Sequence, residues 1–247
     1  MKRIKQISFL LLLVSLIISC TSTKKIQKNL NANSYSMAYL MDTEVADLKK
    51  DIKVSIDSIY FNPSIMSDTT KVIRKKGWFI PLVFVYIWNS QNNCIQGKSM
   101  IEEEIPSFLK KSMIEEIYRS GSFSVDTNDK SNYTLELSID EIGARGPYLS
   151  SGFFYFVLYV YGYSHSDRAG PAVSNLSISY KLKKDNEVIL SNSFDSESTT
   201  EQINKRYTNI NILQQDYAIS MVEATSYNFK NIIELIVNDL NTYFTDK

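Results

Sequence analysis

The C-terminal stretch 212–244 places the strongest constraint on what this chain can fold into. Its apolar side chains recur every three or four residues, and neither glycine nor proline interrupts it. This spacing predicts one long amphipathic helix. The positions that form its apolar face are Ile212, Tyr217, Met221, Val222, Thr225, Phe229, Ile232, Ile233, Ile236, Leu240 and Phe244. Because a helix must bury such a face against another layer, the rest of the chain has to supply that layer.

The second layer is predicted to be a β-sheet. Apolar and polar residues alternate at 52–56, 133–140 and 176–182, which is the pattern of strands with one solvated face. A polar turn at 184–186 precedes another alternating run at 188–194, and the two runs predict a β-hairpin. Strands with one solvated face are usually antiparallel.

Two further segments complete the predicted domain. Residues 79–88 are apolar at both the odd and the even positions, which favours a strand covered on both faces. Residues 106–119 have apolar side chains at helical spacing, and Gly121 follows them as a natural C-cap. We therefore predict an α+β fold: a two-layer sandwich of a mainly antiparallel sheet, with an internal helix and a long C-terminal helix on one face. Residues 51–247 are predicted to form a single domain.

A tyrosine-rich strand is predicted at 153–163. Its even positions 154, 156, 158 and 160 are apolar and are expected to face the core, whereas the odd positions include Tyr155, Tyr159, Tyr161 and Tyr163. Tyrosine is enriched where proteins meet partners or membrane interfaces. We therefore expect Tyr155, Tyr159 and Tyr161 to form a partner surface. The alternative is that the predicted loops 164–171 or 195–209 cover these side chains.

The N-terminus reads as an export signal. Three cationic residues, Lys2, Arg3 and Lys5, precede the apolar run 7–18, which ends at Ser19 and Cys20. The sequence Leu-Ile-Ile-Ser-Cys at this point resembles the lipobox of bacterial lipoproteins. The resemblance implies that 1–19 is cleaved and that Cys20 is acylated. The alternative, an uncleaved anchor, fits poorly because the run is shorter than the ~20 residues a bilayer requires.

After Cys20, the residues to position 50 are predicted to form a lipidated N-terminus and a flexible tether, because 21–36 is polar and lacks a clear period. Without residues 1–19, the chain carries 24 Lys and Arg against 27 Asp and Glu, since three of the 27 cations lie in the signal. There is no clustered basic motif, so no nucleic-acid partner is expected. A single cysteine, Cys94, would remain, which leaves no disulfide framework.

The sequence lacks the combinations of residues that a hydrolytic triad or a zinc site requires. The only imidazole is His165, in a stretch predicted as a polar loop, and a hydrolytic triad or a zinc site needs more than this. Glu102, Glu103 and Glu104 precede the helix at 106–119, where negative charge complements the helix dipole. We therefore expect no enzyme activity, no metal and no cofactor. The alternative is a lipid-anchored hydrolase that uses carboxylates.

The predicted order of elements resembles that of small envelope lipoproteins. In the lipoproteins that assist lipopolysaccharide assembly, and in auxiliary lipoproteins of ABC-type transporters, a tether leads to a strand, a helix, a meander and a closing helix. The resemblance is one of architecture, and it carries over no residue except Cys20. It implies a non-catalytic accessory or assembly factor, held in a membrane by its lipid and facing the periplasm, with an envelope protein or lipid as partner. Thr21 lacks the aspartate that retains many lipoproteins in the inner membrane, which favours the outer membrane.

The lipid anchor can be tested directly. Replacing Cys20 with alanine removes the only acylation site that the lipobox resemblance implies. The Cys20→Ala variant should lose the mass of the acyl chains and should retain the signal segment. Intact-mass measurement and membrane fractionation check this. A variant with the mass and the membrane association of the wild type, apart from the substitution itself, would contradict the anchor.

Overall fold

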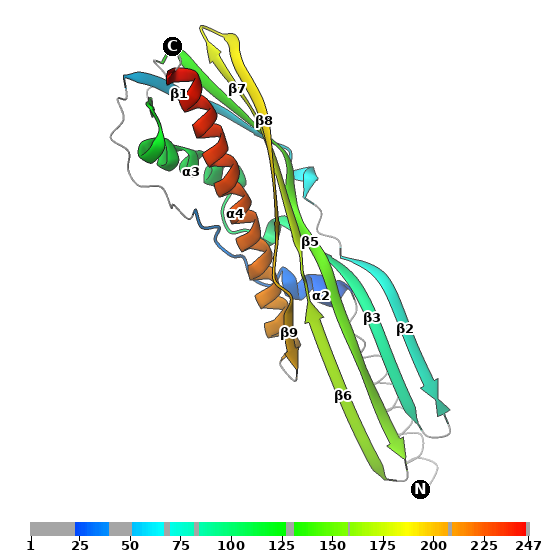
Figure 1. Cartoon of the computed structure of the whole chain (residues 1–247). Helices are drawn as coiled ribbons and strands as arrows, with labels where there is room; N and C mark the ends of the chain where they lie inside the picture. The colour runs from blue at the N-terminus through cyan, green and yellow to red at the C-terminus, as the bar shows by residue number, and fades with distance from the viewer. Residues whose placement is uncertain are drawn as a thin grey trace.

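The computed structural model describes residues 23–39, 51–66, 70–81, 84–126, 131–157, 159–206 and 209–245. The nine described strands form one sheet, and the longer helices lie against one of its faces (Figure 1). The strands are β1 (Ile52–Phe61), β2 (Lys71–Ile80), β3 (Val85–Ile95), β4 (Phe123–Val125), β5 (Tyr133–Val157), β6 (Val160–Ala169), β7 (Val173–Lys184), β8 (Glu187–Thr199) and β9 (Ile203–Arg206). The helices are α2 (Thr23–Leu30), α3 (Ile105–Ser120) and α4 (Ile210–Thr245), with short 3₁₀ turns at Pro63–Ile65 and Lys98–Met100.

Strand β5 joins the two halves of this sheet. It is 25 residues long, which corresponds to roughly 80 Å of extended chain. Its first half pairs with β1 and β7, and its second half pairs with β3 and β6. Only the β1–β4 and β1–β5 pairs in the described sheet are parallel. The predicted α+β architecture with a mainly antiparallel sheet is therefore confirmed.

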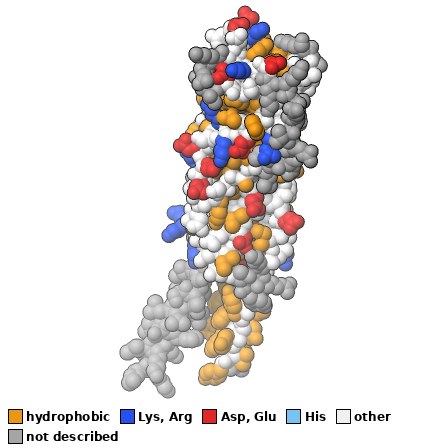
Figure 2. Space-filling model, turned by 90° about the vertical axis from the view of Figure 1, so that its left-hand side faces the viewer, with side chains coloured by type: hydrophobic (Ala, Val, Ile, Leu, Met, Phe, Trp, Pro, Cys, Tyr) orange, Lys and Arg blue, Asp and Glu red, His pale blue; other side chains and the backbone are white. Residues whose placement is uncertain are grey.

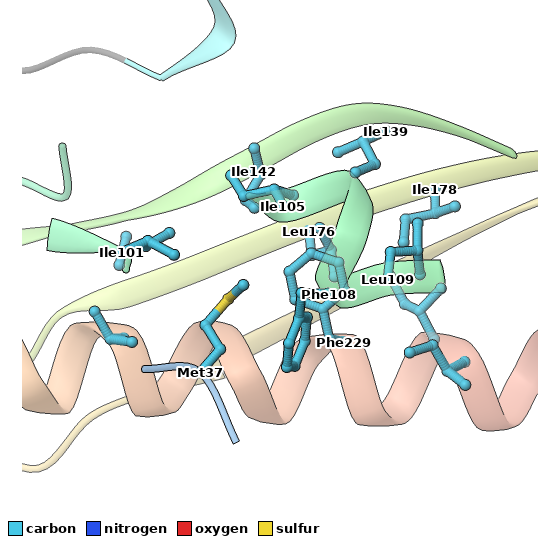
Figure 3. Packing of buried hydrophobic residues seen from close by; sticks show 14 of the residues in the cluster. Met37, Ile101, Ile105, Phe108, Leu109, Ile139, Ile142, Leu176, Ile178 and Phe229 are labelled. Carbon is cyan, nitrogen blue, oxygen red and sulfur yellow. The ribbon is translucent and has the colours of Figure 1, made fainter. Parts of the chain in front are cut away.

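The core lies between the first half of the sheet and helices α3 and α4. Figure 3 shows Phe108 and Leu109 of α3 between α4 and the strands. The Phe108 and Phe229 rings meet edge to face with centroids 5.3 Å apart, so the two helices cover the same face of the sheet, as predicted. Each large apolar side chain buried here contributes about 1.5–3 kcal/mol. No helix among the described residues is both long and apolar enough to cross a membrane.

The predicted flexible tether is wrong for residues 23–39. This segment contains α2, whose Ile26 and Leu30 are fully buried in the core, as is most of Met37. Hydrogen bonds also hold it, including one from the Asn29 amide to Gln214 Oε1 at 2.8 Å. A single apolar pair spaced four residues apart in a polar octapeptide is too short to give a helical period in the sequence. Residues 1–22, and with them the signal and Cys20, lie outside the described residues, as does 40–50.

Two other local predictions differ from the structure. The turn expected at 143–147 lies inside β5, because Arg145 pairs with Ile95 of β3 and with Val173 of β7. Pairing on both sides outweighs the turn propensity of the glycines and the proline. The expected polar loops 164–171 and 195–209 largely form the end of β6, the end of β8 and the strand β9.

The predicted hairpin of β7 and β8 is confirmed. Its turn residues Asp185 and Asn186 both have positive φ, 50° and 73°. This backbone is that of the two-residue turn that matches the twist of antiparallel strands, and Asp and Asn tolerate it better than most residues.

Candidate functional site

The second half of the sheet extends beyond the core and ends in two adjacent hairpin turns (Figure 1). We call this end the aromatic tip and define it as residues 77–81, 84–88, 152–157 and 159–165. Strands β2 and β3 form one hairpin, β5 and β6 form the other, and β3 pairs with β5 between them. None of the buried core residues of the described chain lies in the aromatic tip.

Large hydrophobic side chains are concentrated at the aromatic tip. Of the eighteen that are exposed among the described residues, ten lie there: Trp78, Phe79, Ile80, Phe84, Ile87, Phe153, Tyr159, Val160, Tyr161 and Tyr163. In Figure 2 hydrophobic side chains gather at the same lower end of the molecule. Contiguous exposed apolar surface of this kind marks sites that bind proteins or membranes.

Both faces of the sheet carry these side chains. Residues that pair directly across strands share a face, so Phe79, Tyr86, Phe154 and Tyr163 lie on one side, and Trp78, Ile87 and Phe153 lie on the other. We call the first side the Trp88 face, because Trp88 stacks on Tyr86 and Tyr163 with ring centroids 5.7 and 6.0 Å apart. We call the second side the Trp78 face, and the exposed fraction of Trp78 there is 72%.

Two glycines allow aromatic rings to lie flat on the strands. A Cβ at Gly152 would come within 2.2 Å of the Trp88 ring, and a Cβ at Gly162 within 2.1 Å of the Tyr155 ring. A ring that covers a cross-strand glycine stabilises a sheet that has no second layer to pack against. The aromatic tip can therefore keep its shape without a core of its own.

This arrangement corrects the prediction for residues 79–88. They were expected to form one strand covered on both faces, yet 79–80 are the end of β2 and 85–88 are the start of β3, and the two strands pair with each other. Proline at position 81 follows the last residue of β2, where no ladder hydrogen bond is required of it. Phe79, Ile80, Phe84 and Ile87 are exposed rather than buried.

The predicted tyrosine surface is only partly assembled as expected. Tyr159 and Tyr161 are exposed, at 93% and 73%, whereas Tyr155 is half-buried. The three do not share one face: Tyr155 covers Gly162 on the Trp78 face, Tyr161 lies opposite Phe156 on the Trp88 face, and Tyr159 lies in the turn between the strands. The expected inward face of even positions is also wrong, since Val160 is 61% exposed. The chain reverses after Val157, so the alternation does not continue through one strand.

A polar cluster that the sequence did not reveal lies at the base of the aromatic tip. His165 and Asp167 lie two residues apart on β6, and Ser150 of β5 pairs with Asp167. The His165 Nε2 atom is 3.1 Å from Asp167 Oδ2 and 3.3 Å from Ser150 Oγ. Their period-2 spacing would have placed His165 and Asp167 on one face, had residues 164–169 been recognised as a strand.

The cluster lacks the geometry of a hydrolytic relay. Such a relay places the carboxylate at one imidazole nitrogen and the nucleophile at the other, whereas here Asp167 and Ser150 both lie at Nε2. Burial raises the pKa of Asp167, and this effect is opposed by hydrogen bonding from Ser150 and by His165. Trp88 and Tyr163 flank the imidazole, with ring centroids 6.0 and 6.2 Å away. The cluster therefore closes the base of the aromatic stack.

The other candidates from the sequence do not form a site in the described residues. No group of three or more His, Cys, Asp or Glu side chains that could hold a metal ion is found among them. Glu104 is the N-cap residue of α3, so the three glutamates precede that helix. Cys94 lies in β3 rather than in a turn, and burial raises the pKa of its thiol to about 12, which keeps it protonated and unreactive.

Comparison with known proteins assigns no function. No family model matches the chain, and no curated protein matches it. Among solved structures, the chain is similar to the crystal structure of protein XCC0632 from Xanthomonas campestris, described by the family model DUF330. The two are 11% identical with a TM-score of 0.46, and the match covers 87% of this chain and 98% of the other.

The buried carboxylate generates a pH-dependent prediction. The folded-state pKa of Asp167 is raised above its ordinary value of 3.8, so its contribution to stability is lost as the pH rises through the folded pKa. Asparagine has the same size and never ionises. The Asp167→Asn variant should therefore unfold at a higher temperature than the wild type at about pH 7, and the difference should shrink as the pH falls through the raised pKa of Asp167 and should be lost below its ordinary value of 3.8.

Thermal unfolding followed over this pH range measures the effect. The control is Asp57→Asn, at an exposed carboxylate of β1, which should change stability by less than about 0.5 kcal/mol. An Asp167→Asn variant that is less stable than the wild type near neutral pH would show that His165 and Ser150 outweigh the burial of the charge.

Proposed function

We propose that this protein is a non-catalytic accessory or assembly factor of the bacterial cell envelope. It is held in a membrane by a lipid on Cys20, faces the periplasm, and docks another envelope component through the aromatic tip. The observation that carries the proposal is the position of the exposed apolar side chains. Ten of them extend beyond the core on two adjacent hairpins, where they contribute nothing to the packing of the body.

Two features support a docking role over catalysis. The Ser150–His165–Asp167 cluster places both partners at the same imidazole nitrogen, which gives no path for a relay. The exposed residues are also of the type that dominates binding energy, since Trp and Tyr are the aromatic side chains enriched at interface hot spots.

The proposed location rests on the N-terminal sequence. The cationic residues, the apolar run and the Ser19–Cys20 pair support export and acylation, and Thr21 supports the outer membrane. The order of elements along the chain resembles that of accessory lipoproteins, but the partner has to come from the chemistry of the aromatic tip. An aromatic, largely uncharged surface favours a partner that is itself apolar.

The docking role can be tested by replacing the tyrosines of the aromatic tip. The triple variant Tyr155→Ser, Tyr159→Ser and Tyr161→Ser removes three aromatic rings while the core stays intact. Recovery of the docked envelope component with the tagged full chain should fall at least about ten-fold, the equivalent of roughly 1.4 kcal/mol. Quantitative mass spectrometry of the material recovered from membranes measures it.

A matched control uses exposed tyrosines elsewhere. Tyr60, Tyr118 and Tyr227 are 68%, 70% and 50% exposed and lie on β1, α3 and α4. Changing these three to serine should leave the recovery unchanged. If the two triple variants recover the same components in the same amounts, docking through the aromatic tip is wrong.

A further inference from the structure

The apolar side chains of the aromatic tip surround the sheet rather than form a one-sided patch. Phe79 and Tyr163 are exposed on the Trp88 face, and Trp78 and Ile87 are exposed on the Trp78 face. A groove on a protein typically covers one face of an inserted element. A lipid interface covers every side of what enters it, and Trp and Tyr are enriched at the depth of the head groups.

The charge of this half of the sheet points to an anionic partner. This half of the sheet contains six Lys or Arg and one Asp, counted over residues 71–81, 84–95, 145–157 and 159–169. The whole chain has 27 Lys or Arg and 27 Asp or Glu. That one acid, Asp167, is 5% exposed. Four of the cations, Lys71, Arg74, Lys75 and Lys76, are exposed on β2 just before Trp78. Cations near an anionic bilayer surface are attracted to its head groups.

We infer that the occupant of the aromatic tip is the surface of an anionic lipid bilayer. The two hairpin turns enter the interfacial region, and the four cations of β2 follow behind them, with Lys76 nearest to the head-group phosphates. The inference deepens the proposed function and rests on it for the envelope location. It names the docked component as lipid, whereas the proposed function leaves the component open.

The spacing of the residues fits shallow insertion. Lys76 precedes the turn residue Pro81 by five positions, or roughly 17 Å of extended strand. Hence the cations can stay at the head groups while the aromatic residues reach the boundary of the acyl chains. In the described sheet, β2 pairs with β3 alone, and β6 pairs with β9 only from Ser166 onward. Open edges are not tolerated in the hydrocarbon region, so the strands themselves must remain in the interface.

The proposed anchor places the same bilayer within reach. Cys20 precedes Thr23, the first residue of α2, by three positions, which is at most about 10 Å of chain. Helix α2 is bound at the base of the β2–β3 hairpin, where the Gln27 amide contacts the Ile95 carbonyl at 3.4 Å. From Ile95 to Val85 the strand spans roughly 33 Å. A lipid on Cys20 therefore keeps the aromatic tip within roughly 45 Å of the membrane in which it is anchored.

The two tryptophans of the chain provide the probe. In the Trp88→Phe variant, Trp78 is the only tryptophan, and with excitation at a wavelength that tyrosine does not absorb it reports the exposed end of the tip. The full chain is reconstituted with vesicles of phosphatidylglycerol and phosphatidylcholine whose acyl chains are brominated near the head group. We expect the Trp78 emission to shift to shorter wavelength and to be quenched at least about two-fold. In the Trp78→Phe variant, the half-buried Trp88 should be quenched less.

The cations are tested in the Trp88→Phe background. Changing Lys71, Arg74, Lys75 and Lys76 to glutamine should reduce the quenching of Trp78 to its level in pure phosphatidylcholine vesicles. The matched control changes Lys110 and Lys111, exposed cations of α3, to glutamine and should leave the quenching unchanged. Raising the salt concentration should act like the four substitutions, because exposed charges are screened.

Three outcomes would overturn the inference. Trp78 that is quenched equally in anionic and uncharged vesicles excludes the charge contact, and Trp78 that is not quenched in either excludes insertion. A spectral shift that appears without lipid as the protein concentration rises shows that a second copy covers the tip.

If quenching fails but the tyrosine triple variant still loses its envelope component, the tip binds protein, and only the lipid assignment is wrong. If quenching occurs while that variant keeps every protein component, the inference holds, and only docking of a protein through the tip is wrong.

Discussion

The structure depends on strand β5, which runs without interruption through both halves of the sheet. This strand runs from the core, where it pairs with β1 and β7, to the aromatic tip, where it pairs with β3 and β6. Because its backbone groups are paired on both sides for most of its length, the tip is held rigidly to the body. A surface presented on such a strand is positioned more accurately than one on a loop.

The pairing of β5 also explains which parts of the fold could be predicted from the sequence. The long helix α4, the helix α3 and the β7–β8 hairpin follow from local periodicity, since each buries one face against the core. The path of β5 through Gly143 and Pro147 could not be predicted, because pairing with β3 and β7 from distant parts of the sequence overrides a local turn signal. Likewise, the docking of α2 depends on Ile26 and Leu30, a pair too short to be recognised alone.

The candidate site was harder to predict for a different physical reason. The run at 79–88 and the even positions 154–160 were expected to lie in the core, because burying each such side chain normally stabilises a protein by about 1.5–3 kcal/mol. At ten exposed positions of the aromatic tip, the monomer does not gain the stabilisation that burial would provide. Because Tyr155, Tyr159 and Tyr161 are tyrosines, they were predicted to be exposed. The chain turns after Val157, however, so the three side chains do not share one face of the sheet. A sequence that leaves apolar rings in water is consistent with a second component that covers them.

The most direct measurement of the central claim compares the accessibility of two exposed positions in the envelope. Tyr161 and Tyr118 are 73% and 70% exposed, and Cys94 is fully buried. Each tyrosine is replaced separately by cysteine, and the full chain is labelled with a thiol reagent that does not cross membranes. In purified protein without membranes, both variants should react at similar rates. In intact envelopes, the Tyr161→Cys variant should be protected and the Tyr118→Cys variant should still react. Equal labelling of the two variants in the envelope would contradict the claim that the aromatic tip is the docking surface.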